Sequence, residues 1–287
     1  MLHRRPAALL GSIAALILAV PRPCLLAQSE TMPERELRQI VGRQKIILDQ
    51  AAKDGEKADD ESLRVELQEI CHDYELLLHD SPNFAAAYAS YGYLLSKIDM
   101  RKEAAAMLLK ANALDPNIPL VKNELGNYLA EDGKPIEAVN YFIAAIKLEP
   151  NEPLYHYQLG TLLYEARDDF LKKGVYTRPQ IDEAMHNAFK KAAELAPDRI
   201  EFTYRYAESF ADVEKPDWDG ALKVWASLED KAQTPMERGT MRLQAANVLI
   251  KQGKFDHARL LLAMVTEPGL EAQKQKLVAQ LPESAKK

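Results

Sequence analysis

The sequence predicts an all-α fold, an α-solenoid of stacked antiparallel helix pairs in about five to six repeats with a capping C-terminal helix. Glycine is scarce, with 12 in 287 residues, while 47% of the residues are hydrophobic, which favours helices with a packed core. Two residue types also recur with one period of 34 residues: prolines at Pro82, Pro116 and Pro150, and glycines at Gly92, Gly126 and Gly160. A shared period and phase indicate repeated structural units.

Each repeat has the pattern of two short amphipathic helices. Leu125 and Leu129, followed by Phe142, keep the three-four spacing of a helix with one buried stripe. Gly126 is small because two helices are expected to cross there, so a leucine at this position should cost ~1–3 kcal/mol. The residues 132–135 (Asp-Gly-Lys-Pro) are typical of a turn in which glycine takes a positive φ and proline opens the next helix.

These repeats resemble the tetratricopeptide repeat, whose signature places an aromatic, Leu-Gly and Tyr before Ala, Phe, Ala and Pro. The first copy is Tyr88, Tyr91, Gly92, Leu95, Ala104, Leu108, Ala111 and Pro116. The second is Leu125, Gly126, Leu129, Ala138, Phe142, Ala145 and Pro150, and the third is His156, Leu159, Gly160, Leu163, Phe189, Ala192 and Pro197. Two later copies are degenerate, with Ala207 and Trp225 in one and Ala246 and Leu262 in the other, and the resemblance covers about residues 85–268.

The chain is expected to contain four segments. Residues 1–27 form a signal peptide, 28–84 a degenerate N-terminal helix pair, 85–268 the repeat solenoid, and 269–287 a capping helix and tail. The third copy carries an insertion at 167–181, strongly polar and broken by Gly174 and Pro179. We expect this insertion to be an elaboration whose residues 169–179 can be replaced by a short turn without unfolding the solenoid.

The first residues have the features of an export signal. Arg4 and Arg5 precede an uncharged apolar run over residues 8–20, which is shorter than the ~20 residues that span a bilayer. We therefore expect an exported protein, periplasmic or secreted, that belongs to a bacterial envelope and begins near Gln28. An uncleaved anchor and lipidation at Cys24 are the alternatives. Cleavage would leave Cys71 alone, so no intramolecular disulfide could form.

The sequence offers little for catalysis. It contains no phosphate-binding loop, no Ser-His-Asp pattern and no zinc-ligand spacing, so we expect no enzyme activity, no cofactor and no metal. His72 and His79 are better explained as solvated residues than as ligands. Trp225 fills the large apolar position of its repeat, whereas Trp218 is either packed over the preceding turn or an exposed anchor for a partner. Without residues 1–27 the chain has 34 basic and 43 acidic residues, which argues against nucleic-acid binding.

The resemblance implies that the first helix of each repeat lines a concave groove that binds other proteins. The candidate groove residues are Tyr93, Asn123, Asn127, Glu131, Tyr157, Thr161, Tyr164, Glu165, Tyr204 and Glu208. Their amides, tyrosines and carboxylates favour an extended peptide or protein partner with basic and apolar residues, and the mature chain needs no membrane span. The expected function is a scaffold, adaptor or assembly factor. The alternative is a non-catalytic subunit of an envelope enzyme complex, and an enzyme using the insertion is less favoured.

Overall fold

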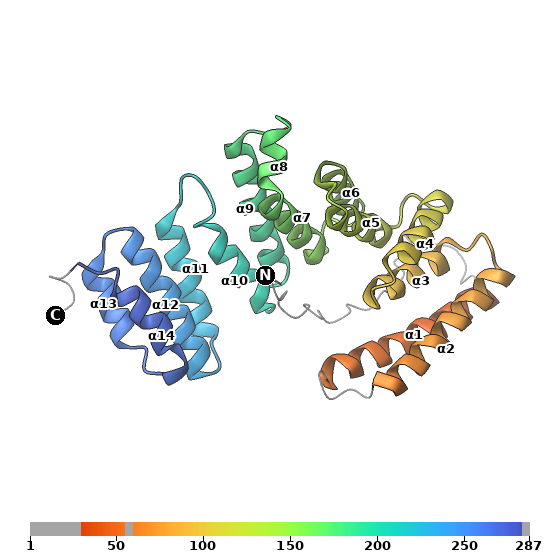
Figure 1. The fold of residues 1–287 in the computed structure, drawn as a ribbon, viewed down its shortest axis with the longest axis horizontal. Coiled ribbons are helices and arrows are strands. Elements are labelled where there is room, and N and C mark those ends of the chain that lie inside the picture. The colour runs from red at the N-terminus through yellow and green to blue at the C-terminus, as the bar shows by residue number, and fades with distance from the viewer. Residues whose placement is uncertain (1–29, 55–59, 283–287) are drawn as a thin grey trace. The chain divides into compact units, whose positions relative to one another are not determined.

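The computed structural model describes residues 30–54 and 60–282 (Figure 1). Over these residues the chain forms fourteen α-helices, one 3₁₀ helix (η2) and no strand, which confirms the all-α expectation. The expected signal peptide, with Cys24, lies outside the described residues. The helices are α1 (Met32–Asp54), α2 (Asp60–Asp80), α3 (Ala85–Lys97), α4 (Arg101–Leu114), α5 (Pro119–Glu131), α6 (Pro135–Leu148), α7 (Pro153–Glu165), α8 (Arg167–Lys172), α9 (Arg178–Leu195), α10 (Ile200–Ser209), α11 (Trp218–Lys231), α12 (Pro235–Lys251), α13 (Phe255–Ala263), η2 (Pro268–Leu270) and α14 (Glu271–Val278).

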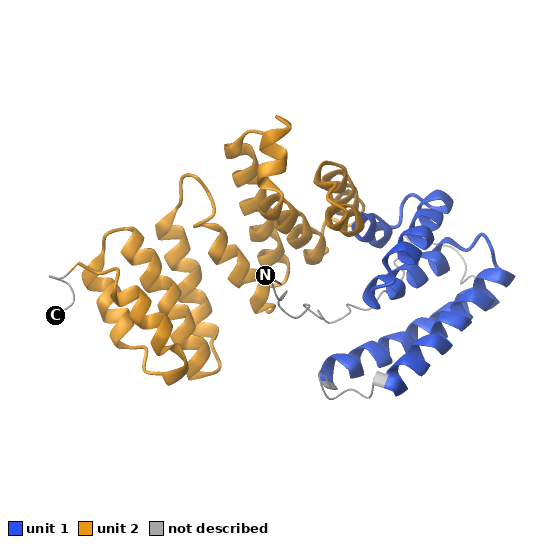
Figure 2. Cartoon of the chain, viewed as in Figure 1, with its two compact units in different colours: residues 1–125 blue, residues 126–287 orange. Residues whose placement is uncertain are grey.

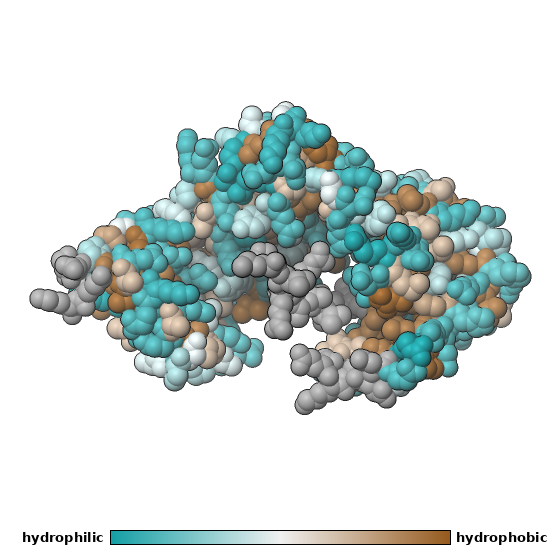
Figure 3. Space-filling view, in the orientation of Figure 1, coloured by the Kyte–Doolittle hydropathy of each residue, from teal (hydrophilic) through white to brown (hydrophobic). Residues whose placement is uncertain are grey.

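Two compact units divide the chain, residues 1–125 and residues 126–287 (Figure 2). The division falls within α5. None of the helices described is long and apolar enough to cross a membrane. In Figure 3 hydrophilic residues cover most of the visible face, and hydrophobic residues reach the surface in smaller patches, as on ordinary globular proteins.

The first unit is built around a buried tyrosine pair. Tyr74 on α2 is fully buried and stacks on Tyr91 of α3, with ring centroids 5.0 Å apart. The Tyr74 hydroxyl donates a 2.6 Å hydrogen bond to Oε1 of Gln44 on α1, so its polar end is satisfied inside the core. Leu37, together with other apolar residues of α1–α3, surrounds this pair. Helices α1 and α2 thus occupy the segment expected to hold a degenerate pair.

In the second unit, helix pairs cross at the glycines that mark the repeats. A Cβ atom on Gly126 would lie 2.9 Å from the buried Phe142 ring, and one on Gly160 would lie 2.8 Å from the Phe189 ring. Such distances leave no room for a side chain, which agrees with the expected close crossing. The turn before α6 also follows the prediction, because Gly133 has a φ of 73° and the helix begins at Pro135.

The insertion at 167–181 is more than a surface loop, and this corrects our expectation that it can be removed freely. It contains the short helix α8, whose Phe170 has no exposed surface and packs in the core of α6, α7 and α9. Tyr176 lies edge-on to Phe170 with ring centroids 5.7 Å apart. Because the insertion is mostly polar, its composition did not predict that Phe170 would be buried. Removing residues 169–179 would expose part of the core.

The end of the chain forms the short helix expected there. Helix α14 follows η2, and Leu270 and Leu281 on either side of it are buried in a cluster with residues of α12 and α13. Trp225 is 2% exposed, which confirms its place in the core. Within the described residues there is no group of three or more His, Cys, Asp or Glu side chains that could hold a metal ion.

Candidate functional site

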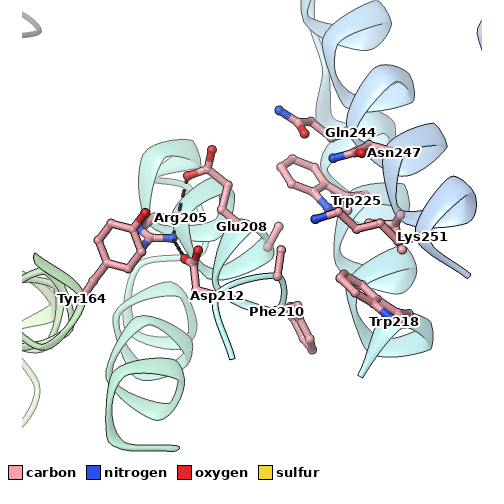
Figure 4. Close-up of a pocket in the computed structure, with 14 residues that line it drawn as sticks. Tyr164, Arg205, Glu208, Phe210, Asp212, Trp218, Trp225, Gln244, Asn247 and Lys251 are labelled. Atoms are coloured by element: carbon pink, nitrogen blue, oxygen red, sulfur yellow. Dashed lines mark hydrogen bonds and ion pairs between the residues drawn. The ribbon is translucent and has the colours of Figure 1, made fainter. Parts of the chain in front are cut away.

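A pocket of about 310 Å³ lies in the second unit between α10 on one side and α11 and α12 on the other (Figure 4). It combines four aromatic rings, two carboxylates, two amides and two cationic groups, with small apolar residues at its base. The lining residues are Tyr164, Arg205, Ala207, Glu208, Phe210, Ala211, Asp212, Trp218, Ala221, Trp225, Gln244, Asn247, Val248 and Lys251. This mixture of apolar surface and convergent polar groups is typical of a binding site.

One wall of the pocket is organised by Arg205 on α10. Its guanidinium lies between two rings, 4.4 Å from the centroid of Tyr164 and 4.4 Å from that of Phe189. Its Nη1 atom is 2.8 Å from a carboxylate oxygen of Asp212 and 3.9 Å from one of Glu208. Since the rings and the short ion pair hold it from several sides, the guanidinium is fixed in place and its charge is largely balanced by Asp212.

Glu208 on the same wall is a half-buried carboxylate, and its negative charge is less well balanced than that of Asp212. Its shortest ion pair is the 3.9 Å contact with Arg205. Burial raises the pKa of Glu208 above its ordinary value, Arg205 lowers it, and the neighbouring charge of Asp212 raises it again. The raised pKa means that the site stabilises the charged form of Glu208 less well than water does.

The facing wall comes from α11 and α12. Trp218 and Trp225 are seven residues apart on α11 and both reach the pocket, as does Lys251 of α12, whose Nζ atom lies 5.2 Å from the Trp218 ring centroid. Gln244 and Asn247 lie on the same face of α12 as Lys251, because residues three, four and seven apart share one face of a helix. This face offers amide donors and acceptors beside aromatic surface.

An ion-pair network centred on Asp182 holds the 210–217 loop, whose residues 210–212 line the pocket. Asp182 on α9 is 4% exposed and accepts hydrogen bonds from Arg178 Nε (2.7 Å) and from the backbone N–H of Glu214 (2.8 Å). Arg167 Nη2 lies 3.4 Å from the same carboxylate. Arg178 also donates to the backbone carbonyl of Asp212 at 3.1 Å. Arg167 begins the insertion and Arg178 lies near its end. Through Asp182 and Arg178, the insertion is tied to the 210–217 loop.

The structure brings only part of the expected groove into this pocket. Tyr164 and Glu208 line it directly. Tyr204 lies behind it, with its ring 5.0 Å from Trp225 and its hydroxyl accepting a 2.9 Å hydrogen bond from Gln244. Tyr157 is half-buried between Phe189 and Phe202, with Thr161 beside its hydroxyl. Glu165 is exposed at the end of α7.

The remaining candidates lie on α3 and α5. Asn123 is fully buried and its Oδ1 atom has no hydrogen-bond partner, while its Nδ2 donates to Glu124 at 3.3 Å. Asn123 therefore has no surface that a partner could contact, and the prediction that it lines the groove is wrong. Tyr93 is half-buried with Lys97 Nζ 4.8 Å from its ring, Asn127 is half-buried, and Glu131 is exposed. Their role in binding stays a prediction.

Sequence reasoning missed Arg205 and the α12 wall. Gln244, Asn247 and Lys251 keep the same helical spacing that selected residues in the earlier repeats, so extending that stripe to the degenerate last copy would have found them. Trp218 is half-buried against Trp225 and its neighbours, and its role as an anchor for a partner stays a prediction.

Comparison with solved structures identifies the architecture. YrrB, described as a TPR protein with an unusual peptide-binding site, matches with a TM-score of 0.58 at 18% identity, over 71% of this chain and 96% of its own. PilF of Pseudomonas aeruginosa matches with a TM-score of 0.58 at 15% identity, over 87% of this chain and 100% of its own. Naa15/Naa10 bound to HypK-THB matches with a TM-score of 0.54 at 13% identity, over 87% of this chain and 34% of that one.

No family model matches the sequence, and a search of curated proteins gives no match. Identities of this size establish the fold and leave the partner open. The chain has the tetratricopeptide-repeat fold that its 34-residue periodicity predicts.

Proposed function

We propose that this chain is an exported protein-interaction module, a scaffold, adaptor or assembly factor that binds a peptide segment of its partner along the first helices of the second unit. The observation that carries the proposal is the pocket lined by residues of α7, α10 and α12, each the first helix of a pair, together with residues of α11 and of the segment 210–212. A fold of stacked helix pairs holds such a site on rigid elements, which limits the entropy lost on binding.

The composition of the pocket supports a peptide with basic and apolar residues. Aromatic surface from Tyr164 and Trp218 is available to apolar groups, and Gln244 and Asn247 can pair with a peptide backbone. Glu208 and the exposed Glu165 favour basic side chains. The peptide-binding site named for YrrB, a protein with the same fold, adds weight to this type of ligand.

The charged N-terminus and the apolar run over residues 8–20 support export, and thus an envelope or secreted partner. Intact mass of the exported protein tests this part of the proposal. A mass that begins near Gln28 would support it, whereas a full-length chain or a lipid on Cys24 would contradict it.

An affinity pull-down from the native envelope fraction, with pocket variants as bait, tests the binding function. Tyr164→Ala combined with Asn247→Ala should remove the partner that the unmodified chain captures, because both residues line the pocket without being fully buried. Glu183→Gln, an exposed change on α9 outside the pocket, is the control. Equal capture by the pocket variant and the control would contradict the proposal. An enzyme in the captured complex would support the alternative of a non-catalytic subunit.

A further inference from the structure

The charges around the pocket differ in how well each is compensated. Asp212 has a 2.8 Å ion pair with Arg205, and Arg205 is also covered by two rings. Lys251 is exposed, so water screens its charge. Among the charged residues lining the pocket, Glu208 alone is half-buried without an ion pair shorter than 3.9 Å. A cation brought next to it would recover electrostatic energy that the free protein lacks.

The apolar surface that the pocket offers a ligand comes mainly from Trp218, which is half-buried. Ala207, Ala221, Val248 and Trp225 also line the pocket, but each is at most 5% exposed. Figure 4 shows the Glu208 carboxylate on the Arg205 side of α10, and Trp218, Trp225, Asn247 and Lys251 across the pocket on α11 and α12. A group that enters the pocket therefore meets the aromatic surface of Trp218 on one wall and the Glu208 carboxylate on the other.

We propose that this pocket is a subsite for one basic side chain of the partner, a lysine or arginine, with its cation beside Glu208 and its methylene chain toward the facing Trp218. The inference rests on the proposed function, because it names the residue type that the module recognises. Long basic side chains match such a site, since they have an apolar stem and a charged end. Arg205 acts here as a positioning residue that holds the wall, not as the ligand's partner.

The molecule provides its own reporter for this subsite. The chain has two tryptophans, and both line the pocket. Their indole N–H signals in NMR spectra of the full chain can therefore be titrated with blocked amino acids, N-acetyl amides of lysine, arginine, norleucine and glutamate, at millimolar concentrations. Norleucine has a lysine-like stem without the charge, and glutamate reverses the charge.

Saturable indole shifts are expected with the lysine or arginine probe, and binding should be about tenfold weaker with norleucine because the charge-assisted contact is lost. Glu208→Gln should weaken the lysine probe by about the same factor. The control Glu183→Gln should leave it unchanged. Since Glu208 is half-exposed, circular dichroism should show a folded variant.

Three results would overturn the proposal: equal binding of norleucine and lysine, preferential binding of glutamate, or no saturable shift with lysine or arginine. Each of these outcomes leaves the pull-down result untouched, so the interaction function can survive the loss of this subsite. Conversely, a chain that binds the lysine probe through Glu208 but captures no partner would contradict the proposed function while retaining the subsite.

Discussion

The third and fourth copies of the repeat, the helix pairs α7/α9 and α10/α11 of the second unit, use the same repeat positions in different ways. In the third pair, Gly160 meets the buried ring of Phe189, where even a methyl group would be 2.8 Å from the ring. In the fourth pair, Ala207 and Trp225 take these positions; each is 2% exposed and packs in the core, and both also border the pocket. The comparison teaches that a repeat position that serves packing alone in one copy can, in the next, serve packing and also border a pocket.

The insertion lies within the third pair, between α7 and α9, and Arg178 and Asp182 tie it to the 210–217 loop of the fourth pair. The buried Phe170 of this insertion gives one of the two largest expected effects. Phe170→Ala should cost ~3–5 kcal/mol, because it leaves a cavity in the core of the third pair. Urea unfolding followed by circular dichroism measures the loss. The exposed Leu260→Ala on α13 is the control and should stay within about 0.5 kcal/mol. A Phe170 variant as stable as this control would restore the view that the insertion is dispensable.

Asp182→Ala should cost a similar ~3–5 kcal/mol, because it leaves the charge of Arg167 buried without its partner and the Glu214 N–H without its acceptor. Stacked repeats can unfold in steps, so tryptophan fluorescence should be followed together with circular dichroism. Both tryptophans belong to the fourth pair. Asp169→Ala, an exposed carboxylate in the insertion, is the matched control. If the two variants were equally stable, the Asp182 network would not hold the 210–217 loop.

Two glycines sharpen the comparison further. Gly126→Leu should cost ~1–3 kcal/mol by overpacking against Phe142. A methyl group added to Gly42, within α1, would have no atom within 4 Å, so Gly42→Ala should stabilise the first unit by ~0.5–1 kcal/mol through lower backbone entropy in the unfolded chain. Thermal and urea unfolding of both variants provide the test. Effects of the same sign would show that helix crossing does not explain the periodic glycines.

The smallest expected effect is that of Glu208→Gln on stability, within about 0.5 kcal/mol at pH 7, because this half-exposed group is screened by water. Burial raises the pKa of Glu208, so the folded state holds its proton to a higher pH than the unfolded state does. Its ionisation thus removes stability as the pH rises through the folded pKa. The variant should therefore be equal to or slightly more stable than the unmodified chain at pH 7. The difference in unfolding free energy, variant minus unmodified chain, should be more favourable to the variant at pH 7 than at low pH. A clearly less stable variant would mean that Glu208 serves the fold.

The sequence predicted the repeats because close helix crossings need glycine, alanine and a large apolar partner at a fixed spacing. It predicted less of the site, because a pocket depends on side chains from separate helices. Asn123 shows the limit: α5 is buried at Val121, Asn123, Glu124 and Leu125, so a spacing rule that assigns one open face fails there. The sequence did not predict the role of Arg205 either, since its position between two rings depends on the fold of α7, α9 and α10.

Site-specific photocrosslinking tests most directly the claim that the partner binds at this pocket. Benzoylphenylalanine would replace Tyr164 at the rim of the pocket or, in the control, Leu260 on α13, which is 65% exposed. After irradiation in the native cells, our account predicts a crosslinked partner from position 164 and none from position 260. Equal crosslinking at both positions, or crosslinking from position 260 alone, would contradict it.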